Sequence, residues 1–186
     1  MAEAALHNPL LTADEYLAFE LGTPLKHEFV DGLVYGMGGA SDRHNLISTT
    51  LLATLFNHLP VRCQVFMADM KLRIRTDRTE VFYYPDILVS CAATDRATLY
   101  REQPVLLIEV LSESTERTDR NEKRDAYLQI PSLEEYVLVS QSAPRIEIYR
   151  RRTQWKHEIL AAGETLRLDS VDLDLAVAAI YARAGF

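Results

Sequence analysis

One stretch of the sequence decides how the chain folds: Val-Leu-Leu-Ile-Glu-Val-Leu, at residues 105–111. Apolar side chains in consecutive positions are typical of a strand that is covered on both faces of a sheet. The exception is Glu109, in the middle of the run. Burial of an ionised carboxylate costs several kcal/mol unless a cation, a metal or a shifted pKa compensates for it. The stretch therefore predicts a central strand whose glutamate is either functional or held in a buried ion pair with an arginine.

A second carboxylate, Asp86, lies in another apolar segment, residues 81–89, directly after Pro85. Proline cannot donate to a strand ladder, so it favours a strand edge or a bulge, where the backbone re-aims a side chain. If the two strands are neighbours, Asp86 and Glu109 converge, and their like charges repel unless a divalent cation lies between them. Carboxylates favour a hard ion such as Mg²⁺ or Mn²⁺, and no His or Cys lies at the spacing that zinc requires.

Local signals predict the elements around these strands. Thr12 and Glu15 have the spacing of a capping box at a helix start, and Asp31-Gly32 between apolar runs predicts a hairpin. Apolar residues recur every four positions from Ile47 to Leu59, which predicts a helix capped near residues 41–42. Further elements are expected as strands at 70–75, 81–89, 135–139 and 145–150, a helix over 119–131 and a short tail helix over 171–184. The order predicts one α/β (α+β) domain over residues 1–186, with a mixed sheet flanked by helices.

Composition limits the classes of function. The chain has 186 residues, 48% of them hydrophobic, with a net charge of −7. An acidic chain does not bind nucleic acid over its whole surface, although residues 145–157 hold five fixed cations against one anion. This basic stretch is either a contact for a phosphate backbone or the solvated outer face of two strands.

The two cysteines and the apolar runs bear on location. Cys63 and Cys91 are too few for a disulfide framework, and neither has another cysteine at metal-ligand spacing. No apolar run approaches the ~18 residues of a membrane helix, and residues 1–20 lack the cationic and apolar regions of a signal peptide. We therefore expect a reducing, cytoplasmic location and no membrane partner.

Three motifs, taken in order, resemble a known family. Tyr84-Pro85-Asp86 is followed by Glu109-Val110-Leu111-Ser112 and then by Lys123 ahead of Tyr127 and the segment Ile-Pro-Ser-Leu at 130–133. The string is similar to a family of small bacterial restriction endonucleases in the PD-(D/E)XK nuclease superfamily, over roughly residues 12–151. The resemblance implies a restriction-endonuclease-like mixed sheet flanked by helices. It also implies hydrolysis of phosphodiester bonds with Mg²⁺.

The resemblance implies roles for individual residues. Asp86 and Glu109 would hold the metal, and Glu28 matches a further acidic ligand before the first hairpin. The superfamily's lysine, two positions after the acidic residue, is replaced by Leu111. The matching ammonium would come instead from Lys123 on the following helix. The structural alternatives are an exposed Lys123 in a charged stretch and a strand-edge Glu28 paired with Lys26 or Arg43.

Two accessory residues complete the candidate site. His44 lies near the buried stripe of its helix, so it is either a site residue or a partly buried histidine that bonds a backbone carbonyl. Tyr127, four residues after Lys123, shares its helix face and is expected to pack there and to position the lysine.

The sequence therefore predicts a Mg²⁺- or Mn²⁺-dependent endonuclease that acts on DNA, with Asp86, Glu109 and Lys123 as its catalytic residues. Enzymes of this fold often act as twofold dimers, so a homodimer is expected. RNA or a branched nucleic acid is an alternative substrate. The alternative from another class is a nuclease fold without activity that binds nucleic acid or regulates another protein. Leu111 and the net charge of −7 favour that alternative.

Overall fold

The computed structural model describes residues 10–77 and 79–186, so residues 1–9 of the predicted domain lie outside it. Its helices are α1 (Ala13–Leu21), α2 (Asp42–His58), α3 (Glu116–Thr118), α4 (Arg124–Tyr127) and α5 (Val177–Tyr181). Its strands are β1 (His27–Val30), β2 (Leu33–Gly36), β3 (Gln64–Met67), β4 (Lys71–Arg75), β5 (Glu80–Tyr83), β6 (Ile87–Ser90), β7 (Tyr100–Arg101), β8 (Leu106–Leu111), β9 (Glu135–Ser140), β10 (Arg145–Arg150), β11 (His157–Ala161), β12 (Thr165–Leu168) and β13 (Leu173–Ala176).

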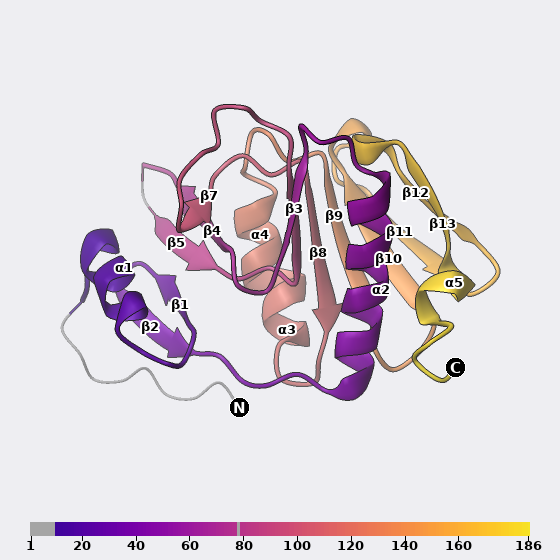
Figure 1. Cartoon of the computed structure of the whole chain (residues 1–186), viewed down its shortest axis with the longest axis horizontal. Coiled ribbons are helices and arrows are strands. Elements are labelled where there is room, and N and C mark those ends of the chain that lie inside the picture. Colours follow the sequence, from indigo (N-terminus) through magenta and orange to yellow (C-terminus); the bar gives the residue numbers. More distant parts are fainter. Residues whose placement is uncertain (1–9, 78) are drawn as a thin grey trace.

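Strand β8 lies inside a six-stranded sheet of order β11-β10-β9-β8-β6-β3. It runs parallel to β9 and antiparallel to β6, and all six of its residues are buried. A five-stranded sheet, β2-β1-β5-β4-β7, lies beside it, and β12 pairs with β13 (Figure 1). The predicted central strand and the mixed sheet flanked by helices are confirmed.

The two faces of β8 meet different layers, because neighbouring side chains of a strand point to opposite faces. Ile108 and Val110 pack in one apolar cluster with Leu51 of α2. Leu107 and Leu111 pack in a second cluster with Tyr127 of α4. Glu109 therefore points to the face that α4 covers, although its neighbours in the sequence belong partly to the core under α2.

Local chemistry explains the first elements. At α1, Thr12 accepts a hydrogen bond from the amide of Glu15, whose carboxylate bonds back to Thr12, which confirms the capping box. Asp31 and Gly32 both have positive φ, 48° and 95°, as the predicted two-residue hairpin between β1 and β2 requires. Ser41 caps α2 by accepting a hydrogen bond from the amide of His44.

Three predicted elements differ from the structure. The segment 81–89 is split at Pro85 into β5 and β6, which belong to different sheets. The helix predicted over 119–131 begins earlier and is interrupted by a π-helical turn over Asp119–Lys123, and α4 ends at Tyr127. The predicted tail helix is instead β13 followed by the short α5. The strands β3, β7, β11 and β12 were not predicted, because each has at most five residues, which is too short to show a clear pattern.

Most cations of the basic stretch 145–157 have partners within the protein, although Arg150 alone among them is buried. Arg150 is buried and its Nε contacts Glu135 Oε1 at 3.1 Å. Arg151 donates to the carbonyl oxygen of Leu133 at 2.6 Å, and Arg152 pairs with Asp169 at 2.7 Å. Whether the exposed cations of this stretch contact a phosphate backbone or form a solvated outer face stays a prediction. Among the described residues, no helix has both the length and the apolar character needed to cross a membrane.

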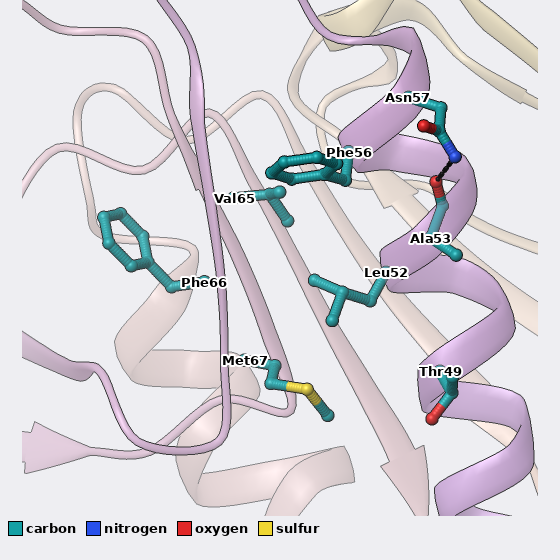
Figure 2. A pocket seen from close by; sticks show the side chains of 8 residues that line it. All are labelled: Thr49, Leu52, Ala53, Phe56, Asn57, Val65, Phe66 and Met67. Atoms are coloured by element: carbon teal, nitrogen blue, oxygen red, sulfur yellow. Dashed lines mark hydrogen bonds between the residues drawn. The ribbon is translucent and has the colours of Figure 1, made fainter.

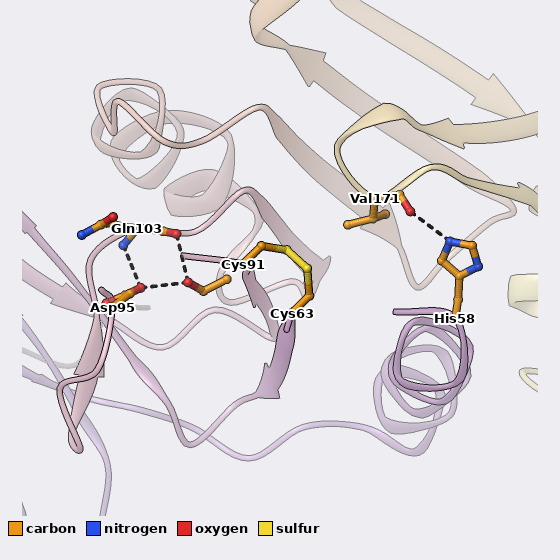
Figure 3. Close-up of a disulfide and its surroundings, with 7 residues drawn as sticks. His58, Cys63, Cys91, Asp95, Gln103 and Val171 are labelled. Atoms are coloured by element: carbon orange, nitrogen blue, oxygen red, sulfur yellow. Dashed lines mark hydrogen bonds between the residues drawn. A yellow bond between two sulfur atoms is a disulfide. The ribbon is translucent and has the colours of Figure 1, made fainter. Parts of the chain in front are cut away.

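The two cysteines form a disulfide, contrary to the expectation of reduced thiols. Cys63 precedes β3 and Cys91 follows β6, and these strands pair antiparallel, so the bond ties the ends of the two strands together (Figure 3). Disulfides are uncommon in the cytosol. The cytoplasmic location therefore stays a prediction, and the cysteines give it no support.

We expect reduction of the Cys63–Cys91 bond to lower the free energy of unfolding by roughly 3–4 kcal/mol, the chain-entropy value for a loop of this length. Urea unfolding with and without dithiothreitol measures the difference. The double variant Cys63→Ser/Cys91→Ser serves as control, because its midpoint should not respond to reductant. Alkylation of both thiols in denatured protein that was never reduced would contradict the pairing.

Candidate active site

Glu109 is held from three directions. Its Oε1 accepts a hydrogen bond from the hydroxyl of Tyr127 at 2.8 Å and lies 3.4 Å from the Lys123 ammonium. Its Oε2 accepts from the backbone amide of Asp86 at 3.1 Å. The predicted ion pair of Glu109 therefore exists, with a lysine in place of an arginine. Tyr127 orients the glutamate directly, and the lysine shares the same oxygen.

Asp86 and Glu109 lie next to each other as predicted. While the amide of Asp86 donates to Glu109, Asp86 Oδ2 accepts from the amide of Val110 at 2.7 Å. These two bonds link the segment before β6 to the middle of β8. Pro85 breaks the strand immediately before Asp86 and frees this segment to turn toward β8. The amide of Asp86 thus fixes the Glu109 carboxylate, and the amide of Val110, the residue after Glu109, fixes the Asp86 carboxylate.

Lys123 is buried and surrounded by acids. Its Nζ lies 2.9 Å from Glu28 Oε1, 3.2 Å from Asp119 Oδ1 and 3.4 Å from Glu109 Oε1. The residue is only 5% exposed, and its ammonium also lies 5.6 Å from the ring centre of Tyr83. The alternative of an exposed lysine in a charged stretch is wrong. The alternative pairing of Glu28 with Lys26 or Arg43 is wrong as well, because Glu28 pairs with Lys123 and Lys26 pairs with Asp69.

Asp119 belongs to the site and was not singled out in the sequence. It is 1% exposed, and its carbonyl accepts from the buried hydroxyl of Tyr136 at 2.9 Å. It stands four residues before Lys123, and the π-helical turn brings both side chains to the same point. That spacing was the available signal, but Asp119 was instead interpreted as the start of a helix.

His44 reaches the site from α2. Its Nε2 lies 3.1 Å from Asp86 Oδ2, so the histidine contacts a site carboxylate as well as lying near the backbone of Val110. Burial by itself lowers the pKa of His44, but the Asp86 carboxylate and the Val110 carbonyl outweigh burial and raise the pKa overall. A protonated His44 therefore adds positive charge beside Asp86.

Negative charge is in excess at the candidate active site. Three carboxylates, those of Glu28, Glu109 and Asp119, surround one lysine, and Asp86 lies next to Glu109. Burial raises the pKa of Glu109 well above its usual range, and the charges of Asp119 and Asp86 raise it further against the effect of Lys123. Burial lowers the pKa of Lys123, but the carboxylates outweigh it and hold that pKa well above its usual range. Additional positive charge would therefore stabilise the site.

The donors fit a hard divalent cation. Within residues 10–77 and 79–186, no three His, Cys, Asp or Glu side chains already form a metal-holding group. Mg²⁺ does not need such a group, because it usually binds one or two carboxylates and completes its shell with water and substrate phosphates. The Asp86 side chain is 19% exposed and its Oδ1 has no hydrogen bond within the described residues. Glu28 Oε1 and Asp119 Oδ1 are buried, and each has the Lys123 ammonium as its ion-pair partner.

The variant Lys123→Met removes the one lysine among these buried carboxylates. We expect it to cost about 3–5 kcal/mol of unfolding free energy at pH 8, because breaking a buried pair leaves charges uncompensated. Glu109 and Asp119 have raised pKa values, so the folded state takes up protons as the pH falls and the loss should be smaller at pH 5.

Urea unfolding at the two pH values measures both effects. Arg124→Met is the matched control, because Arg124 lies outside the carboxylate cluster, pairs with the exposed Asp125 and lies beside Tyr149, so its loss should cost under about 1 kcal/mol at either pH. An equal, small loss for both variants would contradict the charge balance described for Lys123.

Comparison with known proteins bears on the family and the fold of the chain. A family model described as "Uma2: Putative restriction endonuclease" matches residues 13–178. An uncharacterized protein of Synechocystis sp. (strain PCC 6803) is 37% identical over 182 residues, which are 96% of this chain and 95% of that protein. A second uncharacterized protein of the same organism is 36% identical over 146 residues, covering 76% of this chain and 81% of its own length.

A solved structure shares the fold. The crystal structure of a "putative nuclease belonging to DUF820" from Anabaena variabilis superposes with a TM-score of 0.77 over 94% of this chain and 99% of that one. At 17% identity this likeness concerns the fold alone. It confirms the predicted restriction-endonuclease-like architecture. Because the family model covers most of the chain and a relative above 30% identity covers nearly all of it, this chain belongs to the Uma2 family.

Proposed function

We propose that the chain is a Mg²⁺- or Mn²⁺-dependent endonuclease that hydrolyses phosphodiester bonds of DNA. Membership of a family described as restriction endonucleases supports a nuclease with a nucleic-acid substrate. The observation that carries the proposal is the excess of carboxylates at this site, where Asp86 lies next to Glu109 and Glu109 contacts one buried lysine. A folded domain tolerates such repulsion when function requires the charge.

Asp86 and Glu109 would hold the metal ion, with Glu28 and Asp119 near enough to add negative charge around Lys123. When bound, Mg²⁺ polarises the phosphoryl group and lowers the pKa of water. The residues of the chain would orient the other groups. His44 and the Val110 amide fix Asp86 Oδ2, which leaves Oδ1 without a hydrogen bond among the described residues.

Lys123 would supply the charge that Leu111 cannot. Its ammonium contacts the same Glu109 oxygen as the Tyr127 hydroxyl. Lys123 would therefore place its positive charge beside Glu109, as a lysine at position 111 would. A preorganised ammonium in a buried place stabilises negative charge that develops on the phosphoryl oxygens. The three carboxylates hold this ammonium in place before the substrate arrives.

Cleavage of plasmid DNA in millimolar Mg²⁺ or Mn²⁺ tests the proposal. We expect Asp86→Asn and Glu109→Gln to lose at least ~10²-fold in rate, the size typical when an electrostatic element of transition-state stabilisation is removed. Asp125→Asn and Glu122→Gln are matched controls, because both carboxylates are exposed and pair with arginines outside the site. Cleavage that is equal in wild type and Glu109→Gln would show that the activity comes from a contaminant.

Other outcomes of this assay separate the alternatives. DNA that is bound but never cut, with either metal, would favour the inactive binding or regulatory protein. Cleavage of RNA in preference to DNA would move the proposal to the second substrate. Cleavage of both strands of a duplex would agree with the expected homodimer, in which one site faces each strand.

Metal binding can be measured without any substrate. We expect millimolar Mn²⁺ to raise the melting temperature of the wild type by about 3–5 °C if its concentration is tenfold above Kd. Asp86→Asn should show no shift. Without metal it should melt at or above the temperature of the wild type, because it keeps an acceptor for the Val110 amide and removes one of the repelling charges. An equal Mn²⁺ shift in wild type and Asp86→Asn would contradict a metal at this residue.

A further inference from the structure

A glycine-rich segment connects two sides of the candidate active site. Its sequence is Met-Gly-Gly-Ala-Ser, at residues 37–41, between β2 and α2. Gly36, directly before it, pairs with the residue that precedes Glu28 on β1. The last residue of the segment, Ser41, caps the first turn of α2, from which His44 reaches the site. The segment therefore crosses from the neighbourhood of Glu28 to that of His44.

The segment lies at the edge of the six-stranded sheet where β8 and β9 end. Ser41 Oγ donates to Gln141 Oε1 at 2.5 Å, and Gln141 directly follows β9, which runs parallel to β8. Figure 1 shows the chain passing from β2 to α2 on the side of the molecule toward which β8 points. In open α/β sheets, ligands typically bind outside the carboxyl ends of the strands. The segment thus stands where a substrate would approach the site.

The fold itself does not require glycine at the two central positions. Neither Gly38 nor Gly39 has a positive φ, and a Cβ added at either one would meet no other atom within 4 Å. Gly32 is the opposite case, because its φ is 95° and Leu10 lies 3.0 Å from the place of its Cβ. Two uses are left for Gly38 and Gly39: flexibility of the segment, or close approach of a ligand to its backbone.

The backbone of the segment is open to a ligand. Residues 38–41 are exposed, and within residues 10–77 and 79–186 their amides donate no hydrogen bond. Exposed amides are common donors to phosphate oxygens in protein–DNA complexes, where they position the duplex without reading its sequence. Asp42 and Arg43, which follow the segment, carry opposite charges that offset each other. Close approach of a phosphate chain is therefore the use that fits these glycines.

We propose that residues 38–41 bind the sugar–phosphate backbone of DNA beside the phosphodiester bond that is cleaved. The inference rests on the proposed nuclease function and adds to it the segment that holds the substrate. The exposed amides donate to phosphate oxygens, and the absence of Cβ atoms at Gly38 and Gly39 lets the DNA backbone come close enough to accept these hydrogen bonds. A strand held there lies next to both Glu28 and His44.

The rest of α2 offers a different surface. Together with β3 it lines a groove of about 540 Å³, in which Figure 2 shows Leu52 and Phe56 directed toward Val65 and Met67. None of the side chains that line the groove is charged, and most of them are apolar. Such a wall offers few donors to phosphate oxygens. A substitution in the groove therefore serves as a control for DNA contacts elsewhere on α2.

Fluorescence anisotropy of a labelled DNA duplex measures the contact. Ca²⁺, which carboxylates also bind, replaces Mg²⁺, and a gel confirms that the duplex stays whole. We expect Gly38→Val and Gly39→Val each to raise the Kd at least about tenfold, the loss of one hydrogen bond to a charged group. Gly38→Ala and Gly39→Ala should raise it less, because the smaller side chain keeps the DNA backbone less distant. The increase should be the same factor at about 50 and 200 mM salt, because no cation is removed.

The chain offers two matched controls. A Cβ at Gly163 would also meet nothing within 4 Å, but Gly163 lies between β11 and β12, outside the site. Phe56 is 72% exposed and lines the groove. Gly163→Val and Phe56→Ala should leave the Kd unchanged. The urea midpoint and the Mn²⁺ shift in melting temperature should stay as in the wild type for every variant, which separates a lost DNA contact from damage to the fold or the metal site.

Four results would overturn the inference: a wild type that binds no duplex, a Kd that neither valine substitution changes, equal losses for alanine and valine, which would indicate flexibility, or a larger loss for Phe56→Ala. Plasmid cleavage by the same variants keeps the two proposals apart. A wild type that binds DNA through this segment but never cuts it would refute the nuclease alone. Valine variants that bind and cleave like the wild type would refute the segment alone.

Discussion

The contact between the Lys123 ammonium and the buried carboxylates is the constraint on which the site depends. Glu109 cannot remain ionised in a covered strand without a cation, and the nearest cation is this lysine. The lysine is in turn held by Glu28 from β1 and by Asp119 from the π-helical turn. One ammonium thus links both sheets to the helical segment that covers them. It does not neutralise the site, and Asp86 at its edge leaves the balance negative.

The fold explains why these residues meet. Alternation along β8 directs Glu109 toward the face covered by α4, while the core under α2 holds its neighbours Ile108 and Val110. The break at Pro85 lets Asp86 leave its strand and exchange hydrogen bonds with the backbone of β8. His44 then approaches Asp86 from the first turn of α2. Each of these steps uses a general property of strands, proline or helix starts, and together they place the carboxylates next to each other.

Local and periodic signals were enough to predict the elements that surround the site. The apolar run around Glu109, the proline before Asp86 and the capping residues of α1 act through near neighbours, so the sequence displays them directly. The predictions failed where the deciding partner is distant along the chain. Arg150 finds Glu135 only because β9 and β10 pair, and Cys63 finds Cys91 across 28 residues because β3 and β6 pair.

The site could be predicted in part for the same reason. Glu28, Asp86, Glu109 and Lys123 were expected together from the family resemblance, and they do meet, whereas Asp119 was passed over because a buried acid in a charged stretch resembles an exposed one. Whether the meeting point holds a metal ion is tested most directly by a crystal grown with Mn²⁺. The account predicts an anomalous peak between the carboxylates of Asp86 and Glu109, within reach of the Lys123 ammonium, and no peak in Asp86→Asn. Wild-type crystals without a peak, with Glu109 still bonded only to Lys123, Tyr127 and the amide of Asp86, would contradict it.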